Sequence, residues 1–594
     1  MTEVKISPNG KYIASINSFR DKEVRGSYIQ LMNLDTKESK PLYFTDNTEN
    51  VIKNVRWANN EFLMADIVFI FDKGSYNRAR HNYVKININS GKFENIVPLH
   101  KTPGTQTGLY VFHDDPGHVI MGFQRNWKNY LYKVSIDDGR FEQHFGSFDD
   151  GVIGSYGWGL DYYGEVRTAL RYRDRNVQVH VKNASTGKWF EFARYKPYTD
   201  EVVIPGALDS DLHLFYFKKY HEGRLAVFSV DLRESENTER LVYAHPTMDV
   251  SGRFYWSVKN KSIVGVDVVG GEGSTVYWDE KFKAIQKIID NAMPHTRNYI
   301  LNEDYEENRF IVLARNDIEP GAYFLFDQNA KKLDLIGRRK SKLMPEDLSR
   351  FVKHTFTARD GEKIDTFVSM PKSENATKLP MVVVPQPGMF TFNYVLYDDF
   401  VQYLSGEGYA VASFNTRGSF GYGFEFMNQG MGQWGTKNAE DIEDGVDWLI
   451  KQGVADKDKV CIVGNGEGGY AAMMGMVKTP ELFTCGVGIY GIYNLQKYTK
   501  GFRQYPNFSD IYGDYFTDLD DVSPINFVDD ITGGVLIIHN KGSEQGEDMA
   551  DALKSHNVDS EVIEIDGLDQ EFNNYNHRLF MFENVARFLE KYLE

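Results

Sequence analysis

The segment Gly464-Asn-Gly-Glu-Gly-Gly-Tyr470 has glycines at a spacing that suits two kinds of chemistry. It follows the apolar run 459–463 and leads into the helix-like run 471–477. Taken literally, a strand, a G-x-G-x-x-G turn and a helix form a dinucleotide-binding turn. With one substitution, the same segment is a nucleophile elbow, G-x-S-x-G, in which Gly466 replaces the serine that would attack a carbonyl carbon.

The position of the segment favours the elbow. A dinucleotide fingerprint normally opens its domain at the first strand–helix turn. Here at least two strand–helix units precede Gly464, and the acidic residue expected after a second strand is missing, since Glu481 lies within a Thr-Pro-Glu-Leu-Phe turn. We therefore predict an elbow whose nucleophile is absent.

The elements before residue 345 repeat. Strand-like units begin near Val4, Ile52, Gly108, Val152, Val202, Met248 and Glu303. Alternating apolar and polar residues with Asp, Asn and Gly turns indicate antiparallel strands. Units of about four strands at this spacing are typical of propeller blades. The sequence predicts a β-propeller of about seven blades over residues 1–345, with the sixth blade poorly marked.

After residue 345 the pattern changes to apolar strands alternating with helices. Strands are expected at 381–385, 410–414, 460–463, 487–490, 535–538 and 562–565, and helices at 400–404, 439–452, after Tyr470, at 549–555 and at the C-terminal end. Such alternation predicts a doubly wound, mostly parallel sheet covered on both faces. We expect an α/β-hydrolase domain over residues 346–594.

Composition narrows the function. The formal charge of −17 argues against nucleic-acid binding. The sequence has no run of eighteen apolar residues, so no membrane span is expected. The sequence begins within a predicted strand and shows no signal peptide. A trimmed N-terminus would have this appearance, so the sequence is compatible with either the periplasm or the cytoplasm. Cys461 and Cys485 lie in apolar strand-like runs and are expected to be buried thiols rather than a disulfide or a metal site.

Several motifs of the second domain occur in one order: Asn415-Thr-Arg-Gly-Ser-Phe-Gly-Tyr-Gly423, Gln433-Trp-Gly435, Asp441-Ile-Glu-Asp-Gly445, Gly464-x-x-x-Gly-Gly-Tyr470, Thr479-Pro-Glu-Leu-Phe483 and Ser523-Pro-Ile525. In these motifs the chain resembles the prolyl oligopeptidase family, which includes dipeptidyl peptidases and acylaminoacyl peptidases. The resemblance implies a β-propeller followed by an α/β-hydrolase domain with a Ser-Asp-His triad.

The chain departs from that pattern at all three triad positions. The serine is Gly466, which has no side chain to form an acyl-enzyme. The loop that carries the family's aspartate is shortened to 539–545, with Ser543 at the matching place. The family's histidine falls on Gln570, whose neutral amide cannot accept a proton near pH 7. The family's H-G-G-P loop is Gln386-Pro-Gly-Met389, in which Pro387 lacks an N–H donor.

The resemblance therefore implies a pseudo-peptidase that binds a peptide or protein partner, without a cofactor or metal ion. Within it, Tyr470 is a pocket residue, and Glu467, Gln386 and Arg417 are further binding candidates, although Arg417 also fits a structural role. The alternative is an active hydrolase or aminopeptidase with unorthodox residues, such as Glu467 or Glu544 activating water. A third possibility is a scaffold in an assembly, and an oligomer is compatible with the sequence.

Overall fold

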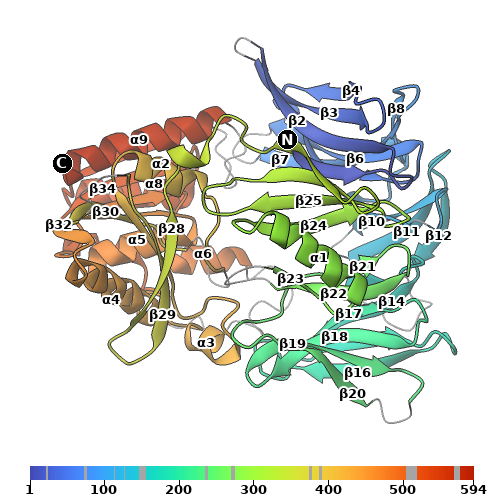
Figure 1. The fold of residues 1–594 in the computed structure, drawn as a ribbon. Helices are drawn as coiled ribbons and strands as arrows, with labels where there is room; N and C mark the ends of the chain where they lie inside the picture. The colour runs from blue at the N-terminus through green and yellow to red at the C-terminus, as the bar shows by residue number, and fades with distance from the viewer. Residues whose placement is uncertain are drawn as a thin grey trace.

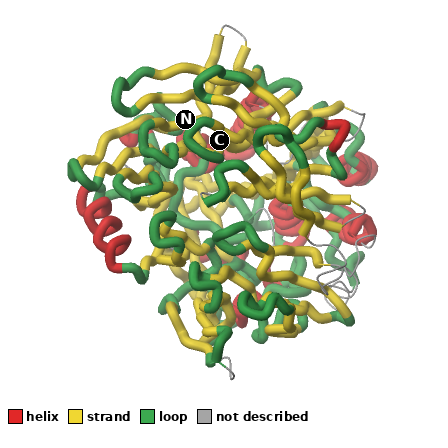
Figure 2. Tube along the Cα trace, turned by 90° about the vertical axis from the view of Figure 1, so that its right-hand side faces the viewer, coloured by secondary structure: helices red, strands yellow, loops and turns green. Residues whose placement is uncertain are grey.

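A computed structural model of the chain describes residues 1–21, 24–72, 77–112, 114–125, 128–145, 155–234, 238–268, 274–372, 377–386, 391–502, 518–566 and 575–594. Seven small antiparallel sheets form the first part and an eight-stranded sheet with helices forms the second, side by side in Figure 1. Figure 2, turned toward the propeller, shows strands over most of that face. The prediction of about seven blades followed by an α/β-hydrolase domain is confirmed.

Four strands build each of six blades, in sequence order from one side of the blade to the other. Blades one to three contain β1 (Thr2–Ile6), β2 (Tyr12–Asp21), β3 (Val24–Asn33), β4 (Ser39–Thr45); β5 (Asn50–Trp57), β6 (Phe62–Asp72), β7 (Asn77–Asn87), β8 (Phe93–Asn95); and β9 (Thr105–Val111), β10 (His118–Arg125), β11 (Lys128–Ser135), β12 (Phe141–Phe145), with the 3-10 turn η1 (Leu99–Lys101) between blades two and three.

Blades four to seven contain β13 (Ser155–Leu160), β14 (Val166–Arg173), β15 (Asn176–Lys182), β16 (Trp189–Tyr195); β17 (Val203–Leu208), β18 (Leu214–His221), β19 (Arg224–Asp231), β20 (Glu239–Tyr243); β21 (Phe254–Ser257), β22 (Ser262–Val268), β23 (Ser274–Tyr277); and β24 (Arg297–Glu303), β25 (Arg309–Arg315), β26 (Ala322–Asp327), β27 (Lys332–Arg338). The predicted start near Val152 lies outside the described residues.

The sixth blade has three strands and is followed by helix α1 (Glu280–Ala292), which the sequence analysis did not foresee. The Asp279 side chain caps the helix by accepting a hydrogen bond from the Phe282 N–H. Phe282, Ile285 and Ile289 are buried. These residues have helical spacing, so the signal for α1 was present in the sequence.

The ring closes without a shared strand, because the first and last blades each use consecutive strands. The Asn302 side chain joins them: its Oδ1 accepts from the Ile6 N–H at 2.9 Å and its Nδ2 donates to the Val4 carbonyl at 3.0 Å. Val4 and Ile6 also pack against Ile311 and Leu313 of the last blade. One amide thus supplies the hydrogen bonds between strands β1 and β24.

The hydrolase sheet has the order β28-β29-β31-β30-β32-β33-β34-β35, antiparallel up to β31 and parallel from there. Its strands are β28 (Phe351–Thr357), β29 (Lys363–Ser369), β30 (Leu379–Val383), β31 (Ala410–Asn415), β32 (Ala455–Asn465), β33 (Cys485–Ile489), β34 (Gly534–Asn540) and β35 (Ser560–Ile565). The predicted boundary at residues 345 and 346 falls in the 3-10 turn η3 (Pro345–Asp347), between β27 and β28, and stays a prediction.

Helices cover both faces of this sheet. They are α2 (Asp399–Gly406), α3 (Phe424–Gln429), α4 (Lys437–Lys451), α5 (Glu467–Lys478), α6 (Leu495–Phe502), α8 (Glu544–Ser555) and α9 (Tyr575–Leu593), with the 3-10 segment η4 (Pro524–Asp530). One core contains residues of α4, α5 and α8, and the other contains residues of α2 and α9. Successive residues of β30 alternate between the two cores, as expected for a doubly wound sheet.

The prediction of two buried thiols is wrong: Cys461 and Cys485 form a disulfide, although both are buried as expected. The two residues are directly opposed on the neighbouring strands β32 and β33, with their Cα atoms 4.7 Å apart. Apolar context alone could not reveal this register. No helix among the described residues is long and apolar enough to cross a membrane.

Candidate functional site

The segment around Gly466 turns strand β32 sharply into helix α5. Gly466 has φ of 59° and ψ of −121°, a conformation that side chains rarely adopt. Its N–H donates to the Ile489 carbonyl at 2.9 Å, so the turn is anchored to β33. A Cβ on Gly464 would lie 1.9 Å from the Gly468 carbonyl oxygen, so the turn also excludes a larger residue there. This is the backbone of a nucleophile elbow with a hydrogen atom in place of the nucleophile.

The four predicted binding residues line one cavity beside this turn, which we call the elbow pocket. Its volume is about 80 Å³. It is lined by Gln386, Arg417, Glu467 and Tyr470, together with apolar residues that include Phe414, Trp434, Ile442, Ala471 and Met474. A cavity of about 150 Å³ accommodates benzene. The elbow pocket therefore suits a small aliphatic group rather than an aromatic ring.

Tyr470 forms a wall of the elbow pocket. Its ring packs edge-on against Trp434, with centroids 5.2 Å apart, and its hydroxyl donates to the Val522 carbonyl at 2.8 Å. Burial raises the pKa of this phenol above its ordinary value. Because the hydroxyl is already bonded, Tyr470 offers a ligand its apolar ring.

Glu467 is half-buried at the first turn of α5, directly after the missing nucleophile. Burial, the charge of Glu467 and a hydrogen bond to that carboxylate raise the pKa of Tyr498 to about 12. The carboxylate is thus held by Tyr498 of helix α6. It is the acidic group nearest in sequence to the elbow, so it could accept a hydrogen bond from an amide or a positively charged ligand.

The other two candidates are engaged within the protein. The Gln386 side chain exchanges hydrogen bonds with Ser419 and donates to Asn415 Oδ1 at 2.7 Å. Arg417 is 2% exposed, and its guanidinium holds the fully buried Asp441 and also Asp360. Both side chains shape the pocket wall while their polar atoms bind protein groups.

The shortened acid loop serves to cap a helix. Ser543 Oγ accepts a hydrogen bond from the Gly546 N–H at 3.4 Å at the start of α8. Gln545 accepts from the backbone N–H groups of Tyr493 and Asn494, each at 2.8 Å. Glu544 is exposed. Gln570 and Pro387 lie outside the described residues, within which no group of three or more His, Cys, Asp or Glu could hold a metal ion.

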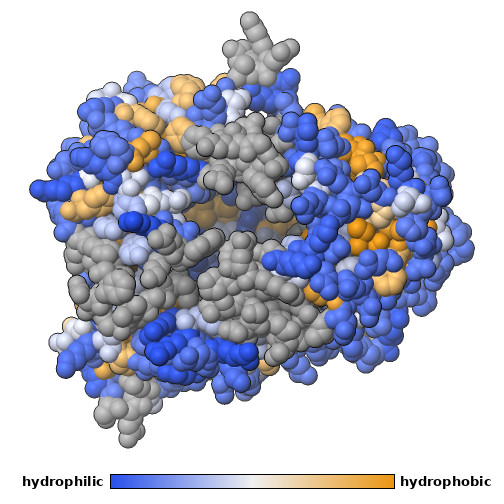
Figure 3. Space-filling model, turned by 180° about the vertical axis from the view of Figure 1, so that it is seen from behind, coloured by the Kyte–Doolittle hydropathy of each residue, from blue (hydrophilic) through white to orange (hydrophobic). Residues whose placement is uncertain are grey.

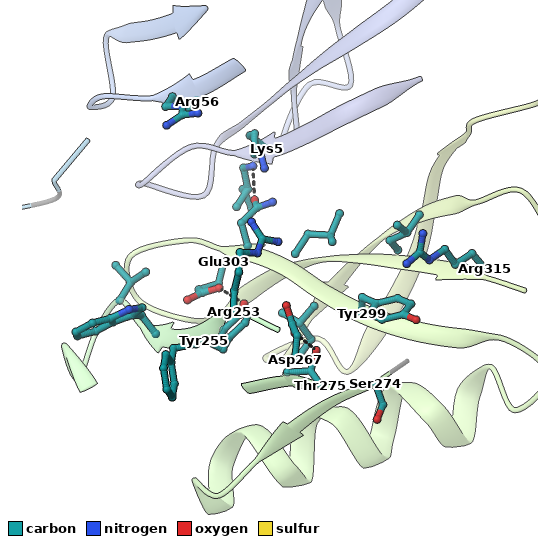
Figure 4. A pocket seen from close by; sticks show the side chains of 18 of the residues that line it. Lys5, Arg56, Arg253, Tyr255, Asp267, Ser274, Thr275, Tyr299, Glu303 and Arg315 are labelled. Carbon is teal, nitrogen blue, oxygen red and sulfur yellow. Dashed lines mark hydrogen bonds between the residues drawn. The ribbon is translucent and has the colours of Figure 1, made fainter. Parts of the chain in front are cut away.

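A larger cavity, the propeller cavity, lies where the first, second, sixth and seventh blades meet, and has a volume of about 770 Å³. Figure 4 shows Lys5, Arg56, Arg253 and Arg315 around it. Its wall also contains Arg339, Asp267, Glu303 and the aromatic residues Trp57, Phe254, Tyr255, Trp256, Tyr299, Phe392 and Tyr394. None of these residues was predicted from the sequence, because they come from separate parts of the chain and no local motif joins them.

The interdomain cleft, of about 670 Å³, continues from this cavity toward the elbow. The two share Arg315, Arg339, Phe392 and Tyr394 in their walls. At its other end the cleft touches Gly464 at the end of β32. A path lined by protein therefore runs from the centre of the propeller to the strand that carries the elbow.

Comparison with known proteins agrees with this architecture. Residues 397–594 match the model of the prolyl oligopeptidase family. Dipeptidyl aminopeptidase BIII of Pseudoxanthomonas mexicana is 27% identical over 506 residues, which cover 83% of this chain and 70% of that protein. Inactive dipeptidyl peptidase 10 of Rattus norvegicus is 22% identical over 281 residues, covering 46% of this chain and 33% of its own length.

Among solved structures, a puromycin-hydrolyzing peptidase of Mycobacterium tuberculosis superposes with a TM-score of 0.74 at 15% identity, covering 99% of this chain and 94% of that one. At this identity the likeness concerns the fold. The elbow backbone, the retained motifs and the matched residues lead to one assignment: the hydrolase domain of this chain, preceded by a seven-bladed propeller, belongs to the prolyl oligopeptidase family.

Proposed function

We propose that this chain is a non-catalytic member of the family that binds a peptide segment, free or part of a protein, in the interdomain cleft. The observation that carries the proposal is Gly466, where the elbow backbone persists without a nucleophile. The helix-capping role of Ser543 supports it, since no carboxylate occupies the predicted acid position. A triad acts as a unit, so a substitute for one of its members would recover little activity.

The elbow pocket supplies the apolar part of the proposed site. Its small volume favours a peptide residue with a short aliphatic side chain, packed against Tyr470 and Met474. The half-buried Glu467 carboxylate lies beside it as a hydrogen-bond acceptor.

Glu467 also motivates a second candidate, in which its carboxylate activates water to hydrolyse an amide or ester. It directly follows the elbow and is held in place by Tyr498. Hydrolysis of an amide by a carboxylate alone is weak chemistry, since the attacking water has no paired acid to protonate the leaving amine. We therefore rank binding first.

Two measurements test the proposal. The intact chain should resist labelling by fluorophosphonates and should not hydrolyse aminoacyl or peptidyl anilides. The immobilised chain should retain peptides from a random octapeptide library, and Ala471→Leu, which fills the elbow pocket, should reduce that retention. Ala550→Leu, on α8 outside the pocket, is the matched control.

The outcomes separate the candidates. Hydrolysis of the anilides that is abolished by Glu467→Gln would contradict the binding proposal and support the hydrolase candidate. Absence of both turnover and peptide retention would contradict both candidates. Retention that is insensitive to Ala471→Leu would move the binding site away from the elbow.

A further inference from the structure

The propeller cavity carries an excess of positive charge in a strongly acidic protein. Five cationic side chains line it against two acidic ones, while the whole chain has a formal charge of −17. The cations come from four blades, with Lys5 on β1, Arg56 on β5, Arg253 before β21 and Arg315 at the end of β25. A surface of one sign enclosed by low-dielectric walls concentrates its field on whatever enters.

Four of these cations form no ion pair with any described residue: Arg56, Arg253, Arg315 and Arg339. Arg56 donates to the Leu109 carbonyl, and Arg339 donates to the Tyr323 hydroxyl at 3.0 Å. The Arg315 guanidinium lies 4.7 Å from the centre of the Tyr299 ring, and its Nε is buried without a hydrogen-bond partner in the described protein. Elsewhere in the described chain, arginines such as Arg417 and Arg167 bind carboxylates.

Lys5 lies close enough to Arg56 and Arg253 for their positive charges to repel its own. Burial lowers the pKa of Lys5, the Glu3 carboxylate opposes this, and the charges of Arg56 and Arg253 lower it further. Lys5 Nζ and Glu3 Oε2 are 3.8 Å apart, so this ion pair is at the long end of the usual range. The folded protein therefore holds charges of one sign together at a cost that a bound anion would relieve.

The two acids in the wall do not neutralise the cluster. Asp267 accepts a hydrogen bond from the Thr275 hydroxyl at 2.7 Å, and Glu303 accepts one from the Tyr255 hydroxyl at 2.6 Å, as Figure 4 shows. Glu303 is buried, and this burial raises its pKa to about 8. At neutral pH it is largely protonated, so Asp267 supplies most of the negative charge of the wall.

We propose that the propeller cavity binds the carboxylates of an acidic peptide whose remaining residues lie in the interdomain cleft. The inference rests on the proposed function, because the ligand is a peptide, and it adds the charge class of that peptide. A peptide fits better than a small anion because the cavity opens into the cleft through the shared wall of Arg315, Arg339, Phe392 and Tyr394. The aromatic rings along this path would pack against apolar residues between the acids.

The test uses the full chain and label-free calorimetry with a retained octapeptide prepared in four forms. Its acidic side chains are present or replaced by amides, and its C-terminus is free or amidated. These pairs distinguish the two sources of carboxylate. The variants are Arg253→Gln, Arg315→Gln and Arg315→Lys, with Arg140→Gln as the control, since Arg140 is an exposed propeller arginine outside the cavity.

We expect the acidic forms to bind at least tenfold more tightly than the neutral form, and added salt to narrow this difference. Arg253→Gln and Arg315→Gln should each weaken binding of the acidic forms by roughly tenfold to a hundredfold, the usual range for one charged hydrogen bond. Neither should change binding of the neutral form. Arg315→Lys should retain part of the affinity, while Arg140→Gln should match the wild-type chain.

Peptide retention without any preference for acidic forms would overturn this inference and leave the proposed function intact. Absence of retention of every peptide would instead contradict the proposed function. Binding of inorganic phosphate that is lost in Arg315→Gln, with no preference among the peptides, would overturn the inference in favour of a small-anion site. Arg253 is exposed, so Arg253→Gln tests the cluster even if a change at Arg315 unfolds the blade.

Discussion

Gly466 combines a conformation that suits glycine with a position that requires a side chain for catalysis. Gly464 and Gly468 around it are held by close contacts, and the Gly466 N–H remains bonded to β33. The shape of the turn is thus maintained by its neighbours. Restoring a hydroxyl there tests whether the other parts of the site are still present.

We expect Gly466→Ser combined with Gln570→His to fold and to remain nearly inactive. A serine held at a positive φ should lower the unfolding free energy of the variant by about 1–2 kcal/mol. The histidine would have no acid to orient it, a loss of roughly 10⁴ in rate for a triad enzyme. Fluorophosphonate labelling and anilide turnover measure the outcome, with Gly117→Ser plus Gln570→His as control, because Gly117 lies in open space. Activity at the level of active relatives would mean that another acid stands in the triad.

Arg417 shows how a residue that resembles part of a site can be structural. Arg417→Met would leave the fully buried Asp441 carboxyl without its cationic partner. Loss of one partner of such a pair costs about 3–5 kcal/mol. We expect the urea-unfolding free energy to fall by this amount, with the double change Arg417→Met, Asp441→Leu recovering part of it. Unchanged stability together with lost peptide binding would mean that Arg417 acts in ligand binding rather than in stabilising the fold.

Strands β32 and β33 are joined by the Cys461–Cys485 disulfide as well as by backbone hydrogen bonds. The bond closes a loop with a sequence separation of 24 residues that contains the elbow and helix α5. It therefore limits how far the elbow strand and its neighbour can separate in the unfolded chain.

Replacing both cysteines by alanine should lower the unfolding free energy by about 3–4 kcal/mol, the loop-closure value for this separation. Thiol labelling of the unfolded wild-type chain checks the bond directly: no maleimide should react before reduction, and two should react after it. Two thiols that react without reduction would mean that Cys461 and Cys485 are unpaired.

The strand residue Glu303 should make propeller stability depend on pH. Its pKa is about 8 in the folded chain, raised by burial and by the nearby Glu307 and Asp304, whereas an unfolded glutamate titrates near 4.5. Between these values the folded state keeps a proton that the unfolded state has released. Stability therefore falls as pH rises through this window, by up to about 1.4 kcal/mol per pH unit.

Urea unfolding at several pH values between 5 and 8 measures this dependence, with limits set by the two pKa values. Glu303→Gln, which cannot ionise at this position, should show a smaller decrease in unfolding free energy with pH than the wild-type chain. Its stability relative to the wild-type chain should therefore be greatest at the upper pH limit. An identical slope in both proteins would show that Glu303 is ionised in the folded chain.

The two domains touch at separate places around the interdomain cleft. On one side, the Tyr397 N–H donates to the Asn316 carbonyl. On another, Asp249 accepts from the Leu225 N–H of its own domain and from the Gly423 N–H of the hydrolase domain. A Cβ on Gly423 would lie 2.6 Å from the Gly223 carbonyl oxygen, so this contact requires glycine. The face of the molecule drawn in Figure 3 is mainly hydrophilic, with hydrophobic residues in smaller groups.

We expect Asp249→Ala to loosen this contact. Two backbone N–H groups would lose their acceptor, at about 1–3 kcal/mol for each if it stays buried. Hydrogen exchange at residues 421–424 should rise by roughly tenfold or more. Asp211→Ala is the matched control, since Asp211 also accepts from two backbone N–H groups but lies exposed on a hairpin. Equal hydrogen exchange in both variants would mean that a contact other than Asp249 holds the two domains together.

Much of the architecture could be predicted because it depends on local patterns. Alternating residues predicted the repeated strand units of the propeller, and the predicted starts near Val4, Ile52 and Gly108 lie in β1, β5 and β9. Helical spacing predicted α4 and α9, and the glycines at 464–469 predicted the sharp turn. In each case the periodicity of nearby side chains or the steric demand of one turn carries the information.

Contacts between distant segments could not be predicted in this way. The pairing of Cys461 with Cys485 depends on the register of two strands, and the ring closure at Asn302 joins the ends of the propeller. The cation cluster exists because four blades each contribute one or two cations to the same cavity. A local pattern cannot specify which residues meet across such distances, since that depends on how whole blades and sheets pack.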